Sequence, residues 1–296
     1  MITRRAFIRN SALAAGSLSL GAACTVREKE SIEQEQQQKT LGLQLYTLRD
    51  QVKEDLPGTL KKVADIGYTE LELFSYTEGQ YFGKSVQELK KMLDDQGLTS
   101  PSGHYLTGNN APDQKGTPIN EWQMAIDDAK TMGHKYMVIA YLMDFERKNM
   151  DDYYAICDLL NAAGEKCKAS DIQLCYHNHA FEFDKFDDKI AYDEMLRRTD
   201  ADLVKMELDH YWIVKAGYDS LDYFAKHPGR FPLWHVKDMN DAGDFTEVGT
   251  GTIDYAAIFA KAEQAGLDHF FIEQDRIAGD HFKSVTTSFG NVEKLV

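Results

Sequence analysis

Residues 204–238 read VKMELDHYWIVKAGYDSLDYFAKHPGRFPLWHVKD, and this stretch decides the fold. It opens with a strand-like apolar run, Val204–Leu208, and a second run, Pro232–Val236, lies near its end. Between the two runs, apolar residues recur at the three- and four-residue spacing of a helix that is buried on one face. A strand, a helix and a second strand in succession are typical of parallel β-structure, because parallel neighbours need a long crossover connection.

The same alternation runs through the chain from Leu41 onward. Eight strand-like runs occur, at Leu41–Leu48, Tyr68–Phe74, Leu98–Ser102, Tyr136–Tyr141, Ile172–His177, Val204–Leu208, Pro232–Val236 and Phe270–Glu273. Helical spacing separates them, most clearly in Leu56–Ile66 and Tyr154–Ala163. Eight such units predict a single (β/α)8 TIM barrel over residues 41–296. The rival, a doubly wound open sheet, normally carries a Gly-rich turn after its first strand, and Leu45–Arg49 has no glycine.

The composition is that of a globular chain, and its charge opposes nucleic acid as a partner. Of 296 residues, 43% are hydrophobic and 27% are charged, which excludes a disordered chain and a multi-span membrane protein. The 48 acidic residues outnumber the 33 basic ones and give a formal net charge of −15. This sign opposes nucleic acid as a partner, because phosphate binding needs a basic face. Oligomerisation stays open.

The first 40 residues differ from the rest and predict export. Residues 1–23 combine arginines, no acidic residue and a small, apolar run, Ser11–Ala23, which is typical of a signal peptide. Arg4-Arg5 resembles a twin-arginine signal, and Gly21–Cys24 resembles a bacterial lipoprotein cleavage site. We expect a polar tether over residues 24–40 and a periplasmic or membrane-anchored protein, with a lipid on Cys24 as its membrane contact. The alternative is a frayed apolar terminus with a chance arginine pair.

Four consecutive predicted strands end in side chains that can bind a metal. These side chains are His177, Asp209, His235 and Glu273. The carboxyl ends of barrel strands meet at one face of the fold, so the four should converge near the barrel axis. Imidazole and carboxylate without thiolate suit one divalent ion (Mn²⁺, Zn²⁺, Co²⁺ or Mg²⁺) in an open site. For each residue taken alone, a hydrogen-bonded structural role is the alternative.

Further candidates follow from their positions beside these ligands. His179 shares a strand face with His177, and Lys237 shares one with His235, because residues two apart point the same way. The other candidates for substrate contact or catalysis are Tyr46, His104 just past the third run, Glu182 and Trp212. For these residues, packing or loop hydrogen bonding is the alternative.

The cysteine and glycine patterns add structural expectations. Removing Cys24 leaves Cys157, Cys167 and Cys175, an odd number without metal-type spacing, so we expect no structural disulfide. Cys175 lies in a strand-like run and is expected in the core. Gly249–Thr252 lies where barrels often bind phosphate, but no basic residue is nearby, so we interpret it as a turn with Thr252 as a helix N-cap.

At these residues the sequence resembles the sugar phosphate isomerase/epimerase family of xylose isomerase-like barrels. The segments that carry the resemblance are Leu43–Arg49, Tyr176–His179, Asp209–Trp212, His235–Asp238 and Gly249–Asp254. The resemblance implies one divalent metal with a ligand from each of the last four strands, usually Glu, Asp, His and Glu. The matching positions are His177, Asp209, His235 and Glu273. Many members carry glutamate at the position of His177, and two-base epimerases use that glutamate as one of their bases.

The resemblance implies proton abstraction next to a carbonyl that the metal polarises. Glu273 is the expected base; Glu182 could substitute for the missing glutamate, and Lys237 or His179 could serve as acid. Sugar phosphates are cytoplasmic and the chain has no obvious phosphate cradle, so the leading hypothesis is an isomerase or epimerase of a non-phosphorylated sugar or keto-sugar. A lyase or hydratase acting on 3-keto-sugars or glycosides is the second hypothesis, and a non-catalytic sugar-binding lipoprotein is the third. A barrel-type apurinic-site endonuclease is opposed by the acidity.

Overall fold

Eight parallel strands close into a barrel in the computed structural model, which describes residues 40–296. They are β1 (Gly42–Gln44), β2 (Glu70–Leu73), β6 (Thr99–Tyr105), β7 (Tyr136–Ile139), β8 (Gln173–His177), β11 (Val204–Asp209), β12 (Leu233–Val236) and β15 (His269–Ile272). The order around the barrel is β1-β15-β12-β11-β8-β7-β6-β2, and every pairing is parallel. The predicted TIM barrel is confirmed. The predicted signal peptide and nearly all of the predicted tether lie outside the described residues.

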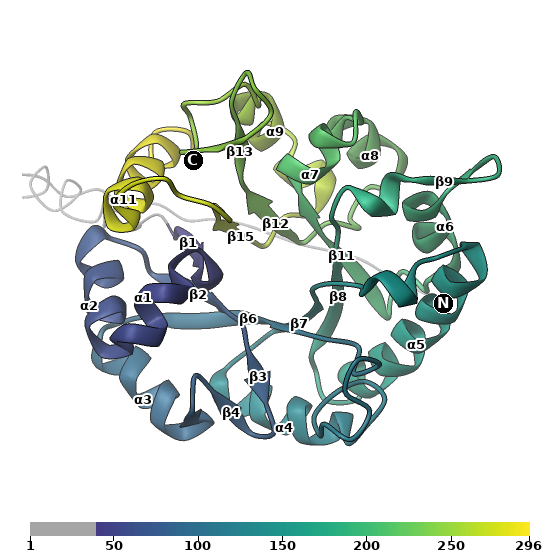
Figure 1. Ribbon diagram of the computed structural model, residues 1–296, viewed down its shortest axis with the longest axis horizontal. Coiled ribbons are helices and arrows are strands. Elements are labelled where there is room, and N and C mark those ends of the chain that lie inside the picture. The colour runs from purple at the N-terminus through teal and green to yellow at the C-terminus, as the bar shows by residue number, and fades with distance from the viewer. Residues whose placement is uncertain (1–39) are drawn as a thin grey trace, which may run out of the picture. The chain divides into compact units, whose positions relative to one another are not determined.

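The helices form an outer ring around the strands (Figure 1). They are α1 (Arg49–Glu54), α2 (Leu56–Ile66), α3 (Val86–Asp95), α4 (Trp122–Met132), α5 (Met150–Lys168), α6 (Ala191–Arg198), α7 (His210–Lys215), α8 (Ser220–Lys226), α9 (Tyr255–Phe259), α10 (Ala262–Ala265) and α11 (His281–Val292). Helix α2 shows why they form: the carboxylate of Asp55 accepts from the amide of Gly58 at its start. It buries Leu56, Leu60 and Val63.

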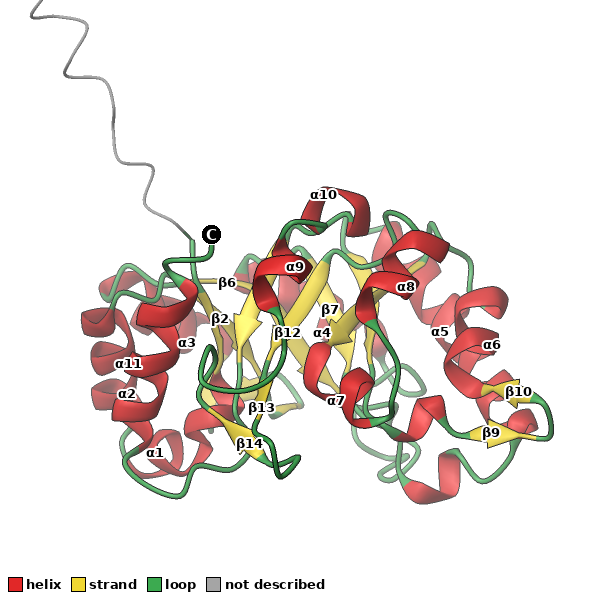
Figure 2. Ribbon diagram, turned by 90° about the horizontal axis from the view of Figure 1, so that it is seen from above, coloured by secondary structure: helices red, strands yellow, loops and turns green. Residues whose placement is uncertain are grey.

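Short strands and 3₁₀ turns lie outside the barrel sheet. They are the three-stranded β3 (Tyr76–Thr77), β4 (Gln80–Tyr81) and β5 (Lys84–Ser85), the pairs β9 (Lys185–Phe186) with β10 (Lys189–Ile190) and β13 (Asp238–Met239) with β14 (Phe245–Thr246), and the 3₁₀ turns Leu45–Leu48, Asp144–Glu146 and Phe181–Phe183. Figure 2 shows β9–β10 and β13–β14 at one end of the barrel and α10 at the other. No helix within residues 40–296 is both long and apolar enough to cross a membrane.

Two strands differ in extent from the sequence expectation. The first strand stops at Gln44, whose side-chain oxygen accepts from the amide of Tyr46 and starts a 3₁₀ turn. The third strand is longer than expected, so His104 lies inside β6 and not beyond it. Its register against β2 shifts by one residue near Pro101. Such a bulge accommodates a residue that has no amide proton to donate.

An apolar layer fills the barrel interior below the polar strand ends. It consists of Val138, Cys175, Leu233 and Phe271, all fully buried. Two residues further along their strands, and therefore on the same inward face, come His177, His235 and Glu273. The burial of Cys175 in this core was predicted, and the described cysteines are free thiols. On three of these strands, the inward-facing side chain is therefore apolar at one position and a candidate ligand two positions later.

The loop after β12 is held by one buried carboxylate. Asp238 accepts hydrogen bonds from the amides of Met239, Gly249, Gly251 and Ile253 at 2.8, 2.9, 3.0 and 3.2 Å. A Cβ on Gly251 would lie 2.3 Å from an Asp238 oxygen, so the loop needs glycine there. The prediction that Thr252 caps the next helix is wrong. Asp254 caps α9, because Thr252 instead donates its hydroxyl to the carbonyl of Met239.

We expect Asp238→Asn to destabilise the protein. One carboxylate oxygen accepts from Gly249 and Gly251, and an amide NH2 in its place would face two N–H donors. At roughly 1.5–3 kcal/mol for each hydrogen bond to a charged group, the free energy of unfolding should fall by about 3 kcal/mol in urea titrations. The exposed Asp241→Asn in the same loop is the control. A difference between the two variants of less than about 1 kcal/mol would contradict this role.

A buried neutral imidazole makes the fold acid-sensitive. Burial lowers the pKa of His134 to about 3, and its Nε2 lies 3.0 Å from the hydroxyl of Ser100. Between pH 6.5 and this value the unfolded chain binds a proton that the folded chain does not, so stability falls as the pH falls. From pH 7 to pH 5 this group should remove about 2 kcal/mol of unfolding free energy. His134→Asn should therefore show a pH dependence smaller by that amount; identical pH dependence in both proteins would refute the prediction.

Candidate active site

A cavity of about 940 Å³ opens at the carboxyl ends of the strands. Seven of the residues singled out from the sequence line it: Tyr46, His104, His177, His179, Trp212, Lys237 and Glu273. Aromatic rings cover much of the remaining wall, from Phe74, Tyr76, Tyr105, Tyr141 and Phe245. Asp275 and two arginines, Arg49 and Arg276, also line it. A polar floor beneath aromatic sides is the surface that a sugar ring, with its apolar faces and hydroxyl edges, would fit.

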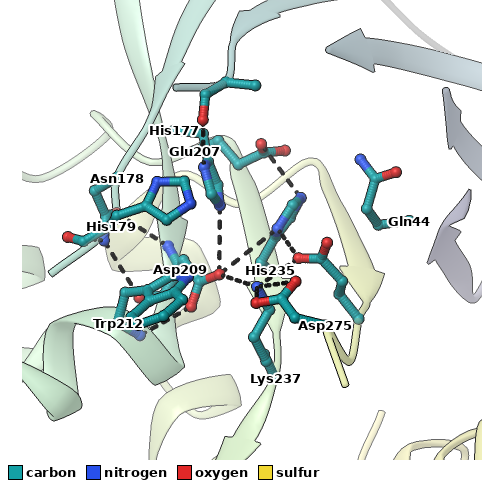
Figure 3. A network of polar contacts seen from close by, with 12 residues as sticks. Gln44, His177, Asn178, His179, Glu207, Asp209, Trp212, His235, Lys237 and Asp275 are labelled. Atoms are coloured by element: carbon teal, nitrogen blue, oxygen red, sulfur yellow. Dashed lines mark hydrogen bonds and ion pairs between the residues drawn. The ribbon is translucent and has the colours of Figure 1, made fainter. Parts of the chain in front are cut away.

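The four predicted metal ligands converge on this floor. His177, Asp209, His235 and Glu273 each offer one ligand atom, and these atoms lie within 4.8 Å of one another. His177 Nε2 lies 3.3 Å from Asp209 Oδ2, and His235 Nδ1 lies 2.7 Å from Glu273 Oε2. Figure 3 shows His177, Asp209 and His235 pointing toward one another from neighbouring strands. We name these four residues the outer group.

Hydrogen bonds outside the outer group orient its members. His177 Nδ1 donates to the carbonyl of Ala140 at 3.1 Å, which leaves the Nε2 lone pair directed at Asp209. Asp209 Oδ1 accepts from the amide of Trp212 at the start of α7, while Oδ2 faces His177. The side-chain oxygen of Asn178 accepts from the amide of Asp209. His177 and Asp209 are therefore each held through a second atom that faces away from the outer group.

The outer group fits a divalent cation. His235 Nδ1 and Glu273 Oε2 are buried and lie 2.7 Å apart, but within residues 40–296 no contact of either atom has the geometry of a hydrogen bond. Burial and the neighbouring His235 lower the pKa of His177 to about 4, so its imidazole is neutral and can ligate. Burial works against ionisation of Asp209, but Lys237 and His177 outweigh it and hold the pKa of that carboxyl well below its usual range. Two imidazole nitrogens and two carboxylates form a suitable donor set for a transition-series divalent ion.

Lys237 places an ammonium beside the outer group. Its Nζ lies 2.9 Å from Asp209, 2.7 Å from Glu273 and 3.1 Å from Asp275. Burial disfavours its charge, but these three carboxylates raise its pKa well above the usual value. Burial raises the pKa of Asp275, which lies at the cavity edge, to about 6 despite Lys237. The β12–β15 side of the cavity therefore holds both a proton donor and carboxylate bases.

The predicted substrate residues occupy the cavity walls. The ring of His179 stacks on Phe181 with an angle of 4° between the planes, and its Nδ1 has no hydrogen-bond partner among the described residues. Trp212 contacts His179 with a ring separation of 5.4 Å. Tyr46 is 41% exposed at the mouth, with the guanidinium of Arg49 over its ring. These positions agree with contact to a ligand, and the roles stay predictions.

Glu182 lies outside the cavity lining. It is fully buried, and it accepts from the hydroxyl of Tyr176 and from the amide of His179. Burial raises its pKa to about 8. In this position it fixes the backbone of His179, and its predicted role as a substitute ligand or base stays a prediction.

A second cluster, which the sequence reasoning did not assemble, lies one pleat deeper than the outer group. It consists of Glu72, His104, Glu207 and His235, and we name it the inner group. Gln44 and Ser102 donate hydrogen bonds to Glu72 at 2.7 and 2.6 Å. A signal was present in Glu70–Leu73, where carboxylates alternate with leucines in a predicted barrel strand. That alternation directs Glu72 into the interior, where a carboxylate must have partners.

Removing one outer ligand should abolish tight metal binding. We expect Asp209→Asn to weaken Mn²⁺ binding by more than about 100-fold, the upper end of the loss seen when an outer-shell partner is removed. Calorimetric titration of the metal-free protein measures this directly. Glu70→Gln is a matched control, because Glu70 also pairs with a histidine, His269, but outside both groups. Equal affinity in Asp209→Asn and wild type would overturn the assignment.

Comparison with known proteins agrees with the fold. The family model described as xylose isomerase-like TIM barrel matches residues 60–278. An inosose dehydratase from Geobacillus kaustophilus is 22% identical over 292 residues, covering 83% of this chain and 92% of that protein. A sugar phosphate isomerase/epimerase structure from Parabacteroides distasonis is 29% identical with a TM-score of 0.76, covering 86% and 94% of the two chains.

A third likeness concerns the metal. The IolI protein, whose crystal structure holds a zinc atom, superposes with a TM-score of 0.69 over 87% of this chain and 98% of its own. At 17% identity this likeness shows the fold alone. The family match, by contrast, covers most of the chain and coincides with the strands that carry the outer group. The chain therefore belongs to the xylose isomerase-like TIM barrel family.

Proposed function

We propose that the protein is a divalent-metal-dependent enzyme that removes a proton next to the carbonyl of a non-phosphorylated keto-sugar or cyclic polyol ketone and then eliminates water. The observation that carries this proposal is the state of His177. Its Nδ1 is bonded to the carbonyl of Ala140 and its Nε2 faces the outer group, so neither nitrogen is free to act as a second base. Acid and base groups then remain on one side of the cavity, where Glu273 and Lys237 are 2.7 Å apart.

A same-face elimination uses this arrangement. A bound divalent ion supplies Lewis-acid stabilisation of the negative charge that develops on the carbonyl oxygen. Glu273 takes the proton from the carbon next to the carbonyl, and the electrons of that C–H bond form the new C=C bond. The C–O bond at the following carbon breaks, and Lys237 protonates the departing hydroxyl so that it leaves as water. Seven similar proteins are named inosose dehydratase, and this supports elimination of water ahead of the isomerisation that the sequence first favoured.

The substrate class follows from the cavity walls and the predicted export. Of the two arginines of the lining, Arg49 donates to the carbonyls of Tyr46 and Asp275, whereas Arg276 is exposed and its nearest carboxylate, that of Asp244, lies 3.8 Å away. The carboxylates of Glu273 and Asp275 also line the cavity and would repel a phosphate dianion. An uncharged ring stacked on Trp212 fits better. The signal sequence predicted in residues 1–23 would also take the protein away from cytoplasmic sugar phosphates.

A single-base isomerase is the second candidate. The adjacent carboxylates of Glu273 and Asp275 both line the cavity, and one base that shuttles a proton between neighbouring carbons needs no partner across the ring. Epimerisation, which needs a donor on the opposite face, is less favoured, because His177 is committed. A non-catalytic sugar-binding protein would have the cavity but no turnover.

Incubation with cyclic and 3-keto-sugars in D2O separates these functions. With Mn²⁺-loaded enzyme we expect a product that has lost one water, seen by mass spectrometry and by a new olefinic or enol signal in NMR. Glu273→Gln and Lys237→Met should each slow turnover by roughly 10²–10⁴-fold. Lys215→Met, a change at the partly exposed lysine that binds the carbonyl of Gly243, is the control.

The other outcomes are equally distinct. A product that has kept all its oxygens and carries deuterium on carbon would show that the enzyme isomerises its substrate and does not eliminate water. Ligand binding without either change, across the keto-sugars tried, would favour the non-catalytic protein. Turnover restricted to phosphorylated sugars would refute the proposed substrate class.

A further inference from the structure

We propose that the inner group is a second divalent-cation site, so that the metal centre of this protein is dinuclear. Its ligand atoms are Nε2 of His104 and His235 and one carboxylate oxygen each of Glu72 and Glu207, and they lie within 4.8 Å of one another. His235 belongs to both groups: Nδ1 faces the outer group and Nε2 faces the inner one. Its imidazole would bridge the two ions.

The contacts within the inner group outnumber the protons available to make them. His104 Nε2 lies 3.0 Å from Glu72 and 2.8 Å from Glu207. His235 Nε2 lies 2.7 Å from Glu72 and 3.3 Å from Glu207. Each Nε2 carries at most one proton, so hydrogen bonds account for only part of this alternating ring of nitrogens and oxygens. A cation at its centre accounts for all four contacts.

The Glu207 carboxylate, whose Oε2 contacts His104 and His235, also carries a buried oxygen without a partner among the described residues. Glu207 is fully buried, and within residues 40–296 its Oε1 has no hydrogen-bond partner. Leaving a buried carboxylate oxygen unpaired is costly, because it has lost its water and gained nothing in return. A cation bound through this carboxylate would compensate for that loss.

The charge balance around His235 also calls for more than one cation. Five carboxylates (Glu72, Glu207, Asp209, Glu273 and Asp275) surround one ammonium, that of Lys237. With His235 as a bridging imidazolate the excess is five negative charges, of which one divalent ion would offset two and two ions would offset four. His104 lines the cavity, so an ion can reach the inner group from solvent.

The donor set selects the kind of ion. Two imidazole nitrogens and two carboxylate oxygens suit Mn²⁺, Co²⁺ or Zn²⁺, while Mg²⁺ and Ca²⁺ prefer all-oxygen sites. Filling both sites requires His235 to release its remaining ring proton to solvent as it becomes a bridging ligand.

The number of Mn²⁺ ions bound per chain tests the proposal. Metal-free full-length protein is dialysed to equilibrium against Mn²⁺, and bound manganese is measured by mass spectrometry. We expect two ions in wild type, one in Glu207→Gln and one in His104→Ala. Glu70→Gln removes a carboxylate that lies outside both groups, on the same strand as Glu72, and this variant should keep two ions. Electron paramagnetic resonance should show coupled Mn²⁺ spins in wild type and an isolated ion in the two inner-group variants.

One ion in wild type that persists in both inner-group variants would overturn the second site. It would mean that His235 donates to Glu72 and His104 donates to Glu207 without a metal. That result would leave the proposed reaction intact, because the outer group alone would still bind its ion. If Glu207→Gln does not fold, His104→Ala provides the second test, because His104 borders the cavity and water can enter the space beside Glu72 and Glu207 once the ring is removed.

Discussion

The imidazole of His235 is the interaction on which the centre of this barrel depends. One nitrogen lies 2.7 Å from Glu273 and the other lies 2.7 Å from Glu72. These partners come from β15 and β2, on either side of β1 in the barrel order, so a single fully buried ring ties strands that are distant in sequence. Buried carboxylates destabilise a protein unless they are paired. The geometry of His235 therefore decides whether the polar interior can exist at all.

The apolar layer beneath this network gives it a rigid base. Leu233 and Phe271 pack in the interior of the barrel, and the inward residues two positions later are His235 and Glu273. Because a strand alternates faces, the floor and the site are built from the same strands at fixed spacing. A slip of one residue in any strand would send its ligand outward to the helices and its apolar neighbour into the site. Register and function are set by the same pairing.

Sequence reasoning predicted those parts of the site that local pattern controls. The strand-end residues His177, Asp209 and Glu273 were placed correctly because parallel strands must finish at one face. The sequence did not predict a role for Glu72, because this residue lies inside β2 and not at a strand end, where functional residues are expected. His104 was placed beyond its strand because Pro101 concealed a bulge that lengthens β6. Which carboxylate meets which imidazole depends on barrel closure, a long-range property that no local pattern contains.

The two walls of the cavity differ in a way that bears on the chemistry. On the β12–β15 side, Lys237 and the carboxylates around it are charged and can move protons. Beside them, His179 and Trp212 present ring faces, and the Trp212 ring centre lies 5.7 Å from Lys237 Nζ; within residues 40–296 His179 Nδ1 and Trp212 Nε1 have no hydrogen-bond partner. A histidine in place of a carboxylate at position 177 strengthens this asymmetry, because its Nδ1 is tied to a backbone carbonyl. In the proposed elimination, a substrate ring against the aromatic wall would expose one face to acid and base together, and a reaction that needs them on the same face would gain most from that arrangement.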